Sequence, residues 1–179
     1  MPGTPVGKKV ALKEKINRAD LAVLFSEELK IGVLFDRMPV QNTGFQSPSQ
    51  AAQTANVVIP NDSKGHWAET WIKDMIRYGV MNVEPDGNFY PDDSINRATY
   101  AMAVQRLLVV ATRDESLETK YFGEPQSRFS DVPSSHFAYN AMALCAERGI
   151  MQADMMTGRF MPTGPVTGAD ALLIIRGLQ

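Results

Sequence analysis

Two arginines occupy the same place in two nearly identical pentapeptides, and their side chains have the chemistry of an anion site. Residues 16–20 read INRAD and residues 95–99 read INRAT, so the arginines are Arg18 and Arg97. An asparagine precedes each arginine, and asparagine is a favoured N-cap of an α-helix. The arginine then lies in the first helical turn, where free N–H groups and the helix dipole attract negative charge. A guanidinium adds paired donors, so the pattern predicts a carboxylate-binding site at each helix start.

Two tryptophans, Trp67 and Trp71, are a second kind of candidate ligand contact, because each offers a flat aromatic face to a sugar ring. Both also fall on the apolar stripe of a predicted helix, since residues 67, 68, 71, 72, 75 and 76 follow helical spacing. Packing of the two indoles in the core is therefore the alternative interpretation.

These candidates lie in a unit that the sequence repeats. Residues 66–81 (HWAETWIKDMIRYGVM) align without a gap with residues 136–151 (HFAYNAMALCAERGIM). The apolar positions predict one helix in each copy, and Gly79 or Gly149 then marks its end. Residues 86–104 and 157–175 continue the match with a turn glycine, an F-x-P segment and a second, mostly apolar helix. Each unit is thus predicted to be helix, short extended loop, helix, and several units must share one core.

The N-terminal segment carries part of a third copy. Residues 7–25 match only the loop and the second helix, with Asn17 and Asp20 as a capping pair, so no first helix is expected ahead of them. The predicted divisions are a partial unit (1–39), a linker (40–56), a second unit (57–112), a connector (113–128) and a third unit (129–179).

Bulk composition excludes several classes of protein. A net charge of −2 argues against a general nucleic-acid binder, and one cysteine, Cys145, rules out an intrachain disulfide. Cys145 lies on an apolar helix face, so it is expected to be a buried hydrophobe. No apolar run approaches the roughly 20 residues of a membrane span, and no signal peptide is present in this chain. No nucleotide, zinc-protease or serine-hydrolase motif is found, so no enzyme activity and no cofactor are predicted.

The third unit, FSDVPSSHFAYNAMALCAERGIM…GRFMPTGPVTGADALLII, resembles the S-layer homology (SLH) domain. It follows that family's pattern of F-x-D-V, (W/F)-A, G-(I/V), F-x-P and (I/V)-T-R-A-E. Residues 59–104 fit nearly as well, and the first unit fits in its INRAD half, so the matches cover about two thirds of the chain. The resemblance implies an all-α, pseudo-threefold bundle of tandem helix–loop–helix units with short extended segments in the loops. It also implies a non-catalytic, extracellular module that binds cell-wall polysaccharide, often pyruvylated, in grooves between the units.

By the same resemblance, the family's binding arginine maps onto Arg18 and Arg97, and its acid two positions later maps onto Asp20. The third unit has Gly168 at the arginine position, and the second unit has Thr99 at the acid position. We therefore expect at most two working grooves. Alternatively, the arginines pair with the acids at positions 92 and 93 or lie in solvent.

The sequence leaves three alternative functions open. Residues 82–93 (NVEPDGNFYPDD) resemble a calcium loop, but the last position is aspartate and the third unit has no such ligand set. Its candidate metal ligands are Asn82, Glu84, Asp86 and Asp93. A glycosidase that uses a carboxylate pair is the enzymatic alternative. A degenerate SLH-like scaffold for protein–protein assembly is the third, and the sequence predicts no oligomeric state.

Overall fold

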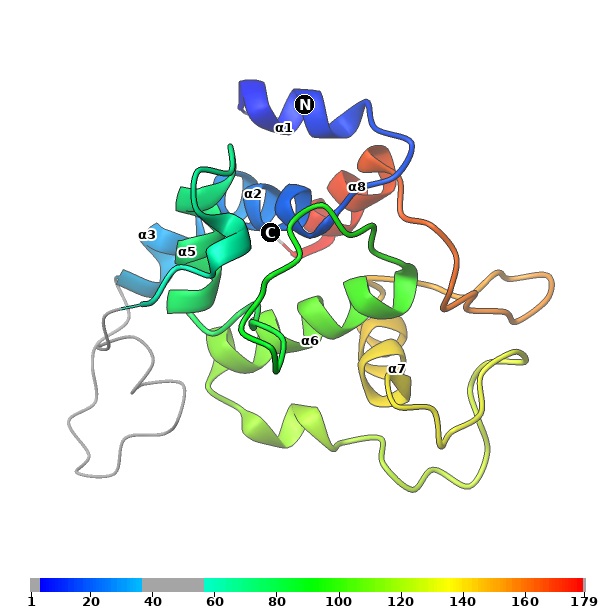
Figure 1. Cartoon of the computed structure of the whole chain (residues 1–179). Coiled ribbons are helices and arrows are strands. Elements are labelled where there is room, and N and C mark those ends of the chain that lie inside the picture. The colour runs from blue at the N-terminus through cyan, green and yellow to red at the C-terminus, as the bar shows by residue number, and fades with distance from the viewer. Residues whose placement is uncertain (1–3, 37–56, 179) are drawn as a thin grey trace, which may run out of the picture.

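The computed structural model describes residues 4–36 and 57–178, and these residues form a helical protein (Figure 1). The α-helices are α1 (Pro5–Ala11), α2 (Arg18–Leu29), α3 (Ile31–Asp36), α5 (Glu69–Arg77), α6 (Arg97–Thr112), α7 (Tyr139–Glu147) and α8 (Gly168–Leu178). Two short 3₁₀ turns are η1 (Asn61–Ser63) and η2 (Glu115–Glu118). Extended segments of the described chain pair only as isolated bridges, which confirms the all-α prediction. The predicted linker, 40–56, lies outside the described residues.

The predicted caps explain where the second helix of each unit begins. In α2, the Asn17 side chain accepts from the Asp20 N–H at 2.8 Å, and Asp20 accepts from the Asn17 N–H at 3.0 Å. Asn96 and Thr167 accept from the N–H groups three residues later, at 2.9 and 3.0 Å. The bonds of Asn17 and Asn96 confirm the capping prediction, and Thr167 caps α8 in the same way.

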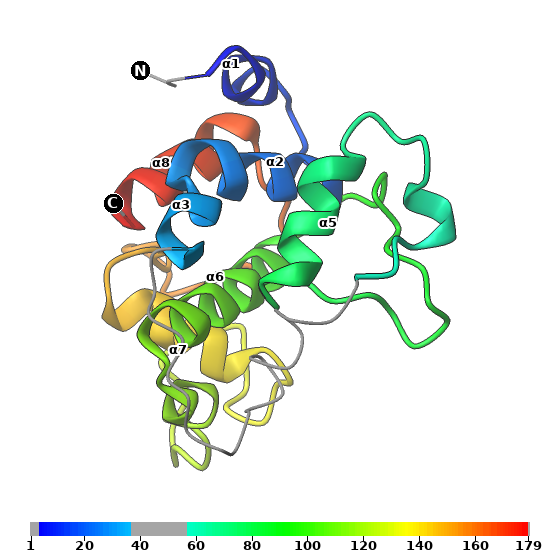
Figure 2. The same ribbon diagram turned by 90° about the vertical axis from the view of Figure 1, so that its left-hand side faces the viewer.

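The helices are arranged in a cyclic order of pairs. The second helix of each unit packs against the first helix of the next, α2 against α5 and α6 against α7, and α8 packs against α1. In both views α1 lies above α8 and α2, and α6 runs through the middle (Figures 1 and 2). This order produces the shared core that the apolar second helices require. Cys145 of α7 is fully buried in it, and burial raises the pKa of its thiol to about 12, as expected of an inert core cysteine.

The first residues of INRAD, of INRAT and of the equivalent segment 166–170 in the third unit are linked by backbone hydrogen bonds in the core. The Ile16 N–H donates to the Val166 carbonyl at 3.0 Å, and the Ile95 N–H donates to the Ile16 carbonyl at 3.1 Å. All three side chains are buried. The repeated pentapeptides therefore join the units to one another as well as starting helices.

The N-terminal residues differ from the prediction. Residues 5–11, assigned to a loop, form helix α1, with Pro5 in its first turn and Thr4 as N-cap, accepting from the Gly7 N–H at 3.1 Å. Proline suits this position because its missing N–H is not needed there. The loop assignment is therefore wrong, because a helix does precede the INRAD segment. Within the described residues, no helix is both long and apolar enough to cross a membrane.

Candidate functional site

Arg18 joins the first pentapeptide to the loop of the following unit. Its Nε donates to the Phe89 carbonyl at 2.7 Å, and its Nη2 donates to the Asn82 carbonyl at 2.8 Å. Its guanidinium also lies over the Phe89 ring, 4.5 Å from the ring centroid. Burial lowers the pKa of Arg18, and the charges of Glu84 and Asp93 oppose that change. An arginine in this setting stays protonated at neutral pH.

Arg97 repeats this arrangement one unit later. Its Nε donates to the Phe160 carbonyl at 2.8 Å, its Nη2 donates to the Gln152 carbonyl at 2.9 Å, and its guanidinium lies 4.8 Å from the centroid of the Phe160 ring. The two predicted site arginines thus share a structural role, because each holds the next unit's loop by two carbonyl groups and an aromatic ring.

The first N–H groups of α2 and α6, predicted to be free for a carboxylate, are already occupied. In α2, Arg18 and Ala19 donate from their backbone nitrogens to the carbonyls of residues 93 and 91, at 3.0 and 2.9 Å. The same two positions of α6 donate to the carbonyls of residues 164 and 162, also at 3.0 and 2.9 Å. The expectation of an anion site built from free helix N–H groups is therefore wrong. Of the two predicted parts of that anion site, the guanidinium groups remain.

Asp20, the acid predicted beside Arg18, belongs to the helix cap. Its side chain is almost fully buried, at 1% exposure, and it accepts from Lys13 Nζ at 2.6 Å as well as from the Asn17 N–H. It does not reach the surface that Arg18 borders. Its charge stabilises the start of α2.

Two acids that the sequence analysis did not name also hold these loops, through backbone N–H groups. Asp62 accepts from the backbone N–H groups of Phe89 and Tyr90, at 3.1 and 2.7 Å. Asp131 accepts from the N–H groups of residues 160 and 161, at 2.8 and 2.9 Å. Burial raises the pKa of each carboxyl, but the backbone donors outweigh it, so both pKa values lie below the usual range. The sequence feature that could have identified them is an acid placed four residues before His66 and five residues before His136.

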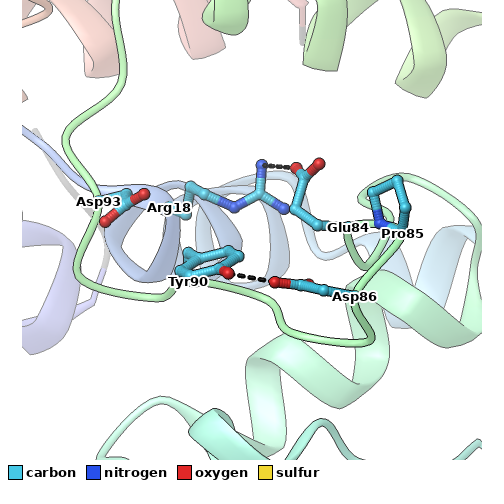
Figure 3. Close-up of a pocket in the computed structure, with 6 residues that line it drawn as sticks. All are labelled: Arg18, Glu84, Pro85, Asp86, Tyr90 and Asp93. Atoms are coloured by element: carbon cyan, nitrogen blue, oxygen red, sulfur yellow. Dashed lines mark hydrogen bonds and ion pairs between the residues drawn. The ribbon is translucent and has the colours of Figure 1, made fainter.

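A surface groove lies beside Arg18, with a volume of about 460 Å³. Its lining residues are Arg18, Glu84, Pro85, Asp86, Tyr90 and Asp93. Arg18 extends towards Glu84, with Nη1 at 3.9 Å from Oε1, and the Tyr90 hydroxyl donates to Asp86 (Figure 3). Tyr90 is 39% exposed and has a left-handed backbone (φ 55°). The groove therefore combines an accessible aromatic ring with charged hydrogen-bonding groups.

Two of the four calcium-ligand candidates, Asn82 and Asp86, already have other partners. The Asn82 carbonyl accepts from Arg18, and Asp86 accepts from the N–H of Asn88 as well as from Tyr90. In the described part of the chain, no three histidine, cysteine, aspartate or glutamate side chains are grouped so that they could hold a metal ion.

The two tryptophans lie outside the groove. Trp67 is 52% exposed, and its ring centroid is 6.1 Å from that of Trp71. The Trp71 indole N–H donates to Glu27 at 2.8 Å, which attaches α5 to α2. The core interpretation is therefore wrong for Trp67, while Trp71 is half-buried against α2. Neither indole is brought together with Arg18.

The third unit has no arginine because no side chain fits there. A Cβ atom built on Gly168 would lie 1.8 Å from the Val10 carbonyl oxygen of α1. The Gly168 N–H donates to the Lys13 carbonyl at 2.8 Å. Helix α1 and the residues after it thus cover the third equivalent position, which leaves Arg18 and Arg97 as the two arginine positions of the ring.

Comparison with known proteins agrees with this architecture. The S-layer homology domain matches residues 61–101 and 128–172. A cellulosome-anchoring protein of Acetivibrio thermocellus is 32% identical over 82 residues, 46% of this chain. An uncharacterized cell wall amidase of Bacillus anthracis is 34% identical over 64% of the chain, and S-layer protein EA1 of the same organism is 26% identical over 71%.

These relatives are much longer proteins, since the chain spans 16%, 20% and 13% of their respective lengths. The similarity concerns the repeated helical units. Both matched regions include the acid, the histidine and the F-x-P loop described above. The chain therefore carries two S-layer homology domains, at residues 61–101 and 128–172.

Proposed function

We propose that this chain is a binding module of the bacterial cell envelope that attaches a protein to cell-wall polysaccharide. The observation that carries the proposal is the groove beside Arg18, where the Tyr90 ring and several charged groups share one open surface. Sugar recognition needs an apolar face for the ring and polar groups for its hydroxyls, and this groove offers both. The family and the names of the cellulosome-anchoring and S-layer relatives support an extracellular, surface-attached role.

The finer proposal is that the polysaccharide bears pyruvate ketals. A ketal carries a carboxylate, and Arg18 and Arg97 place a guanidinium at the same position of two successive inter-unit junctions. Each guanidinium donates the N–H of Nε and one N–H of Nη2 to carbonyl groups, which leaves the two N–H groups of Nη1 and the second N–H of Nη2 to approach a ligand. The geometry supports a carboxylate ligand, and the resemblance to the S-layer homology domain supports a pyruvylated sugar.

We propose further that the module is non-catalytic. Glycoside hydrolysis needs one carboxylic acid with a raised pKa beside a second carboxylate. In the groove, the hydrogen bond from Tyr90 instead lowers the pKa of Asp86. The amidase relative matches over only 20% of its own length, so its activity stays with that protein.

A sedimentation assay with purified wall polysaccharide tests the proposal. The chain should co-sediment with the polymer, and a Tyr90→Met variant should bind less. Methionine is the natural residue at the equivalent position 161, which has the same left-handed backbone (φ 56°), so this variant keeps the loop conformation. Failure of the wild-type chain to bind the polymer would overturn the anchoring function. A stable oligomer detected by light scattering in that case would favour the scaffold alternative.

A further inference from the structure

A single peptide group carries two of the interactions that hold the loop beside the groove. Its carbonyl, which belongs to Phe89, accepts from Arg18 Nε at 2.7 Å, and its N–H, which belongs to Tyr90, donates to Asp62 Oδ2 at 2.7 Å. Both hydrogen bonds involve an ion, and a peptide group polarised between two ions strengthens both of them. The plane of this peptide group is therefore held between a guanidinium from α2 and a carboxylate from η1.

The third unit contains the same arrangement. The Met161 N–H donates to Asp131 Oδ2 at 2.9 Å, and the Phe160 carbonyl of that peptide group accepts from Arg97 Nε at 2.8 Å. The residue that supplies the N–H has a left-handed backbone in both units, with φ of 55° at Tyr90 and 56° at Met161. Non-glycine residues adopt this conformation only where the surrounding contacts hold it. The carboxylate supplies such a contact directly at the N–H of the strained residue.

Asp62 acts on the groove without lining it. Tyr90 and Arg18 line the groove, and Asp62 does not. Because the peptide group is planar, its orientation fixes the φ of Tyr90 and hence the direction in which the ring leaves the backbone. Oδ1 of Asp62 accepts from the Phe89 N–H at 3.1 Å, so both carboxylate oxygens are used and the carboxylate cannot turn freely.

We propose that Asp62 is a positioning residue for polysaccharide binding, which fixes the direction of the Tyr90 ring in the groove. This inference rests on the proposed sugar contact of Tyr90 and names the residue that determines how strong that contact is. The third unit has the same carboxylate and peptide group but carries Met161 instead of an aromatic residue. Positioning of an aromatic ring is therefore a property of the Asp62 site and not of the Asp131 site.

A double-mutant cycle with Tyr90→Met tests this role, with binding of wall polysaccharide measured by isothermal titration. Asp62→Asn removes the charge and places an amide nitrogen where a carboxylate oxygen accepted. It should weaken binding roughly fivefold in the wild-type background and less than about twofold in the Tyr90→Met background. A general loss of stability, or of charge near the groove, would act equally in both backgrounds. The difference between the two backgrounds thus isolates the position of the Tyr90 ring.

Asp131→Asn is the matched control, because it makes the same change beneath Met161. It should lower the free energy of unfolding by as much as Asp62→Asn does, and its effect on binding should be the same in the wild-type and Tyr90→Met backgrounds. Equal losses for Asp62→Asn in both backgrounds, or no loss in either, would overturn the positioning role while the binding function stands. If the wild-type chain does not bind the polymer, the proposed function itself fails.

Ser63→Ala is a milder variant that tests the same role if Asp62→Asn does not fold. The Ser63 hydroxyl donates to Asp62 Oδ1 at 3.2 Å, so its removal leaves the carboxylate freer to turn. The variant should weaken binding about twofold to threefold in the wild-type background and have no effect in the Tyr90→Met background. The same loss in both backgrounds would contradict the inference.

Discussion

The Nε of Arg18 donates to the carbonyl oxygen of Phe89, 71 positions further along the chain, at a distance of 2.7 Å. Arg97 makes the same bond to Phe160, 63 positions away. In both cases the arginine also lies against the phenylalanine ring. The arginine of the repeated pentapeptide therefore connects successive units.

Replacing Arg18 with lysine should lower the free energy of unfolding by about 1–3 kcal/mol, because an ammonium group cannot donate to both carbonyls with the geometry of the guanidinium. Urea denaturation at neutral pH measures the change. Arg176→Lys on the exposed last turn of α8 is the control, with an expected effect within about 0.5 kcal/mol. Equal stability of the two variants would mean that the bonds of Arg18 contribute little to the folded state.

The sequence predicted the repeated helix–loop–helix units because periodicity, caps and turn glycines are local signals. Asn17, Asn96 and Thr167 begin helices where their side chains can accept a backbone N–H. The acceptors of the first N–H groups of these helices were not predictable, because the acceptor carbonyls belong to a different unit, which is a neighbour only in space. Helix α1 was missed for a related reason, since it packs on α8, which is more than 150 residues away in the sequence.

Gly168 provides a test of the packing of α1 against α8. Gly168→Ala should lower the free energy of unfolding by about 1–3 kcal/mol, because its Cβ would displace the backbone at Val10. Gly177→Ala, in the same helix, meets no atom within 4 Å and should be neutral or stabilise by about 0.5–1 kcal/mol. Thermal unfolding compares the two, and hydrogen exchange of residues 5–11 shows whether α1 has detached. Similar melting temperatures for both variants would contradict the close approach of α1 and α8.

Tyr90 is expected to supply the main aromatic contact for sugar. Tyr90→Met should weaken polysaccharide binding roughly tenfold, because tyrosine is over-represented among the few interface residues whose truncation costs more than about 1 kcal/mol. Its unfolding free energy should change little, since Met161 has the same backbone conformation in the other unit. Isothermal titration with a soluble fragment of the polymer measures the affinity. Phe122→Met, on a 63% exposed side chain of the connector, is the control for loss of an aromatic ring elsewhere.

The carboxylates that hold the two loops predict how stability depends on pH. Asp62 and Asp131 have folded pKa values below the ordinary value of 3.8, because backbone donors outweigh the effect of burial. Their contribution is therefore present above the unfolded pKa and is lost as pH falls through the folded pKa. The free energy of unfolding should be level near neutral pH and should fall as the solution is acidified below about pH 4.

Asp131→Asn isolates this effect, because an amide oxygen can still accept from one of the two N–H groups but carries no charge. The variant should be less stable than the wild type at neutral pH, and the difference should shrink as the pH falls below the ordinary value of 3.8 and through the lowered folded pKa of Asp131. Urea denaturation across the acid range measures both curves. Glu115→Gln should follow the wild-type curve. A constant difference between the wild type and Asp131→Asn at every pH would show that the carboxylate charge does not stabilise the loop.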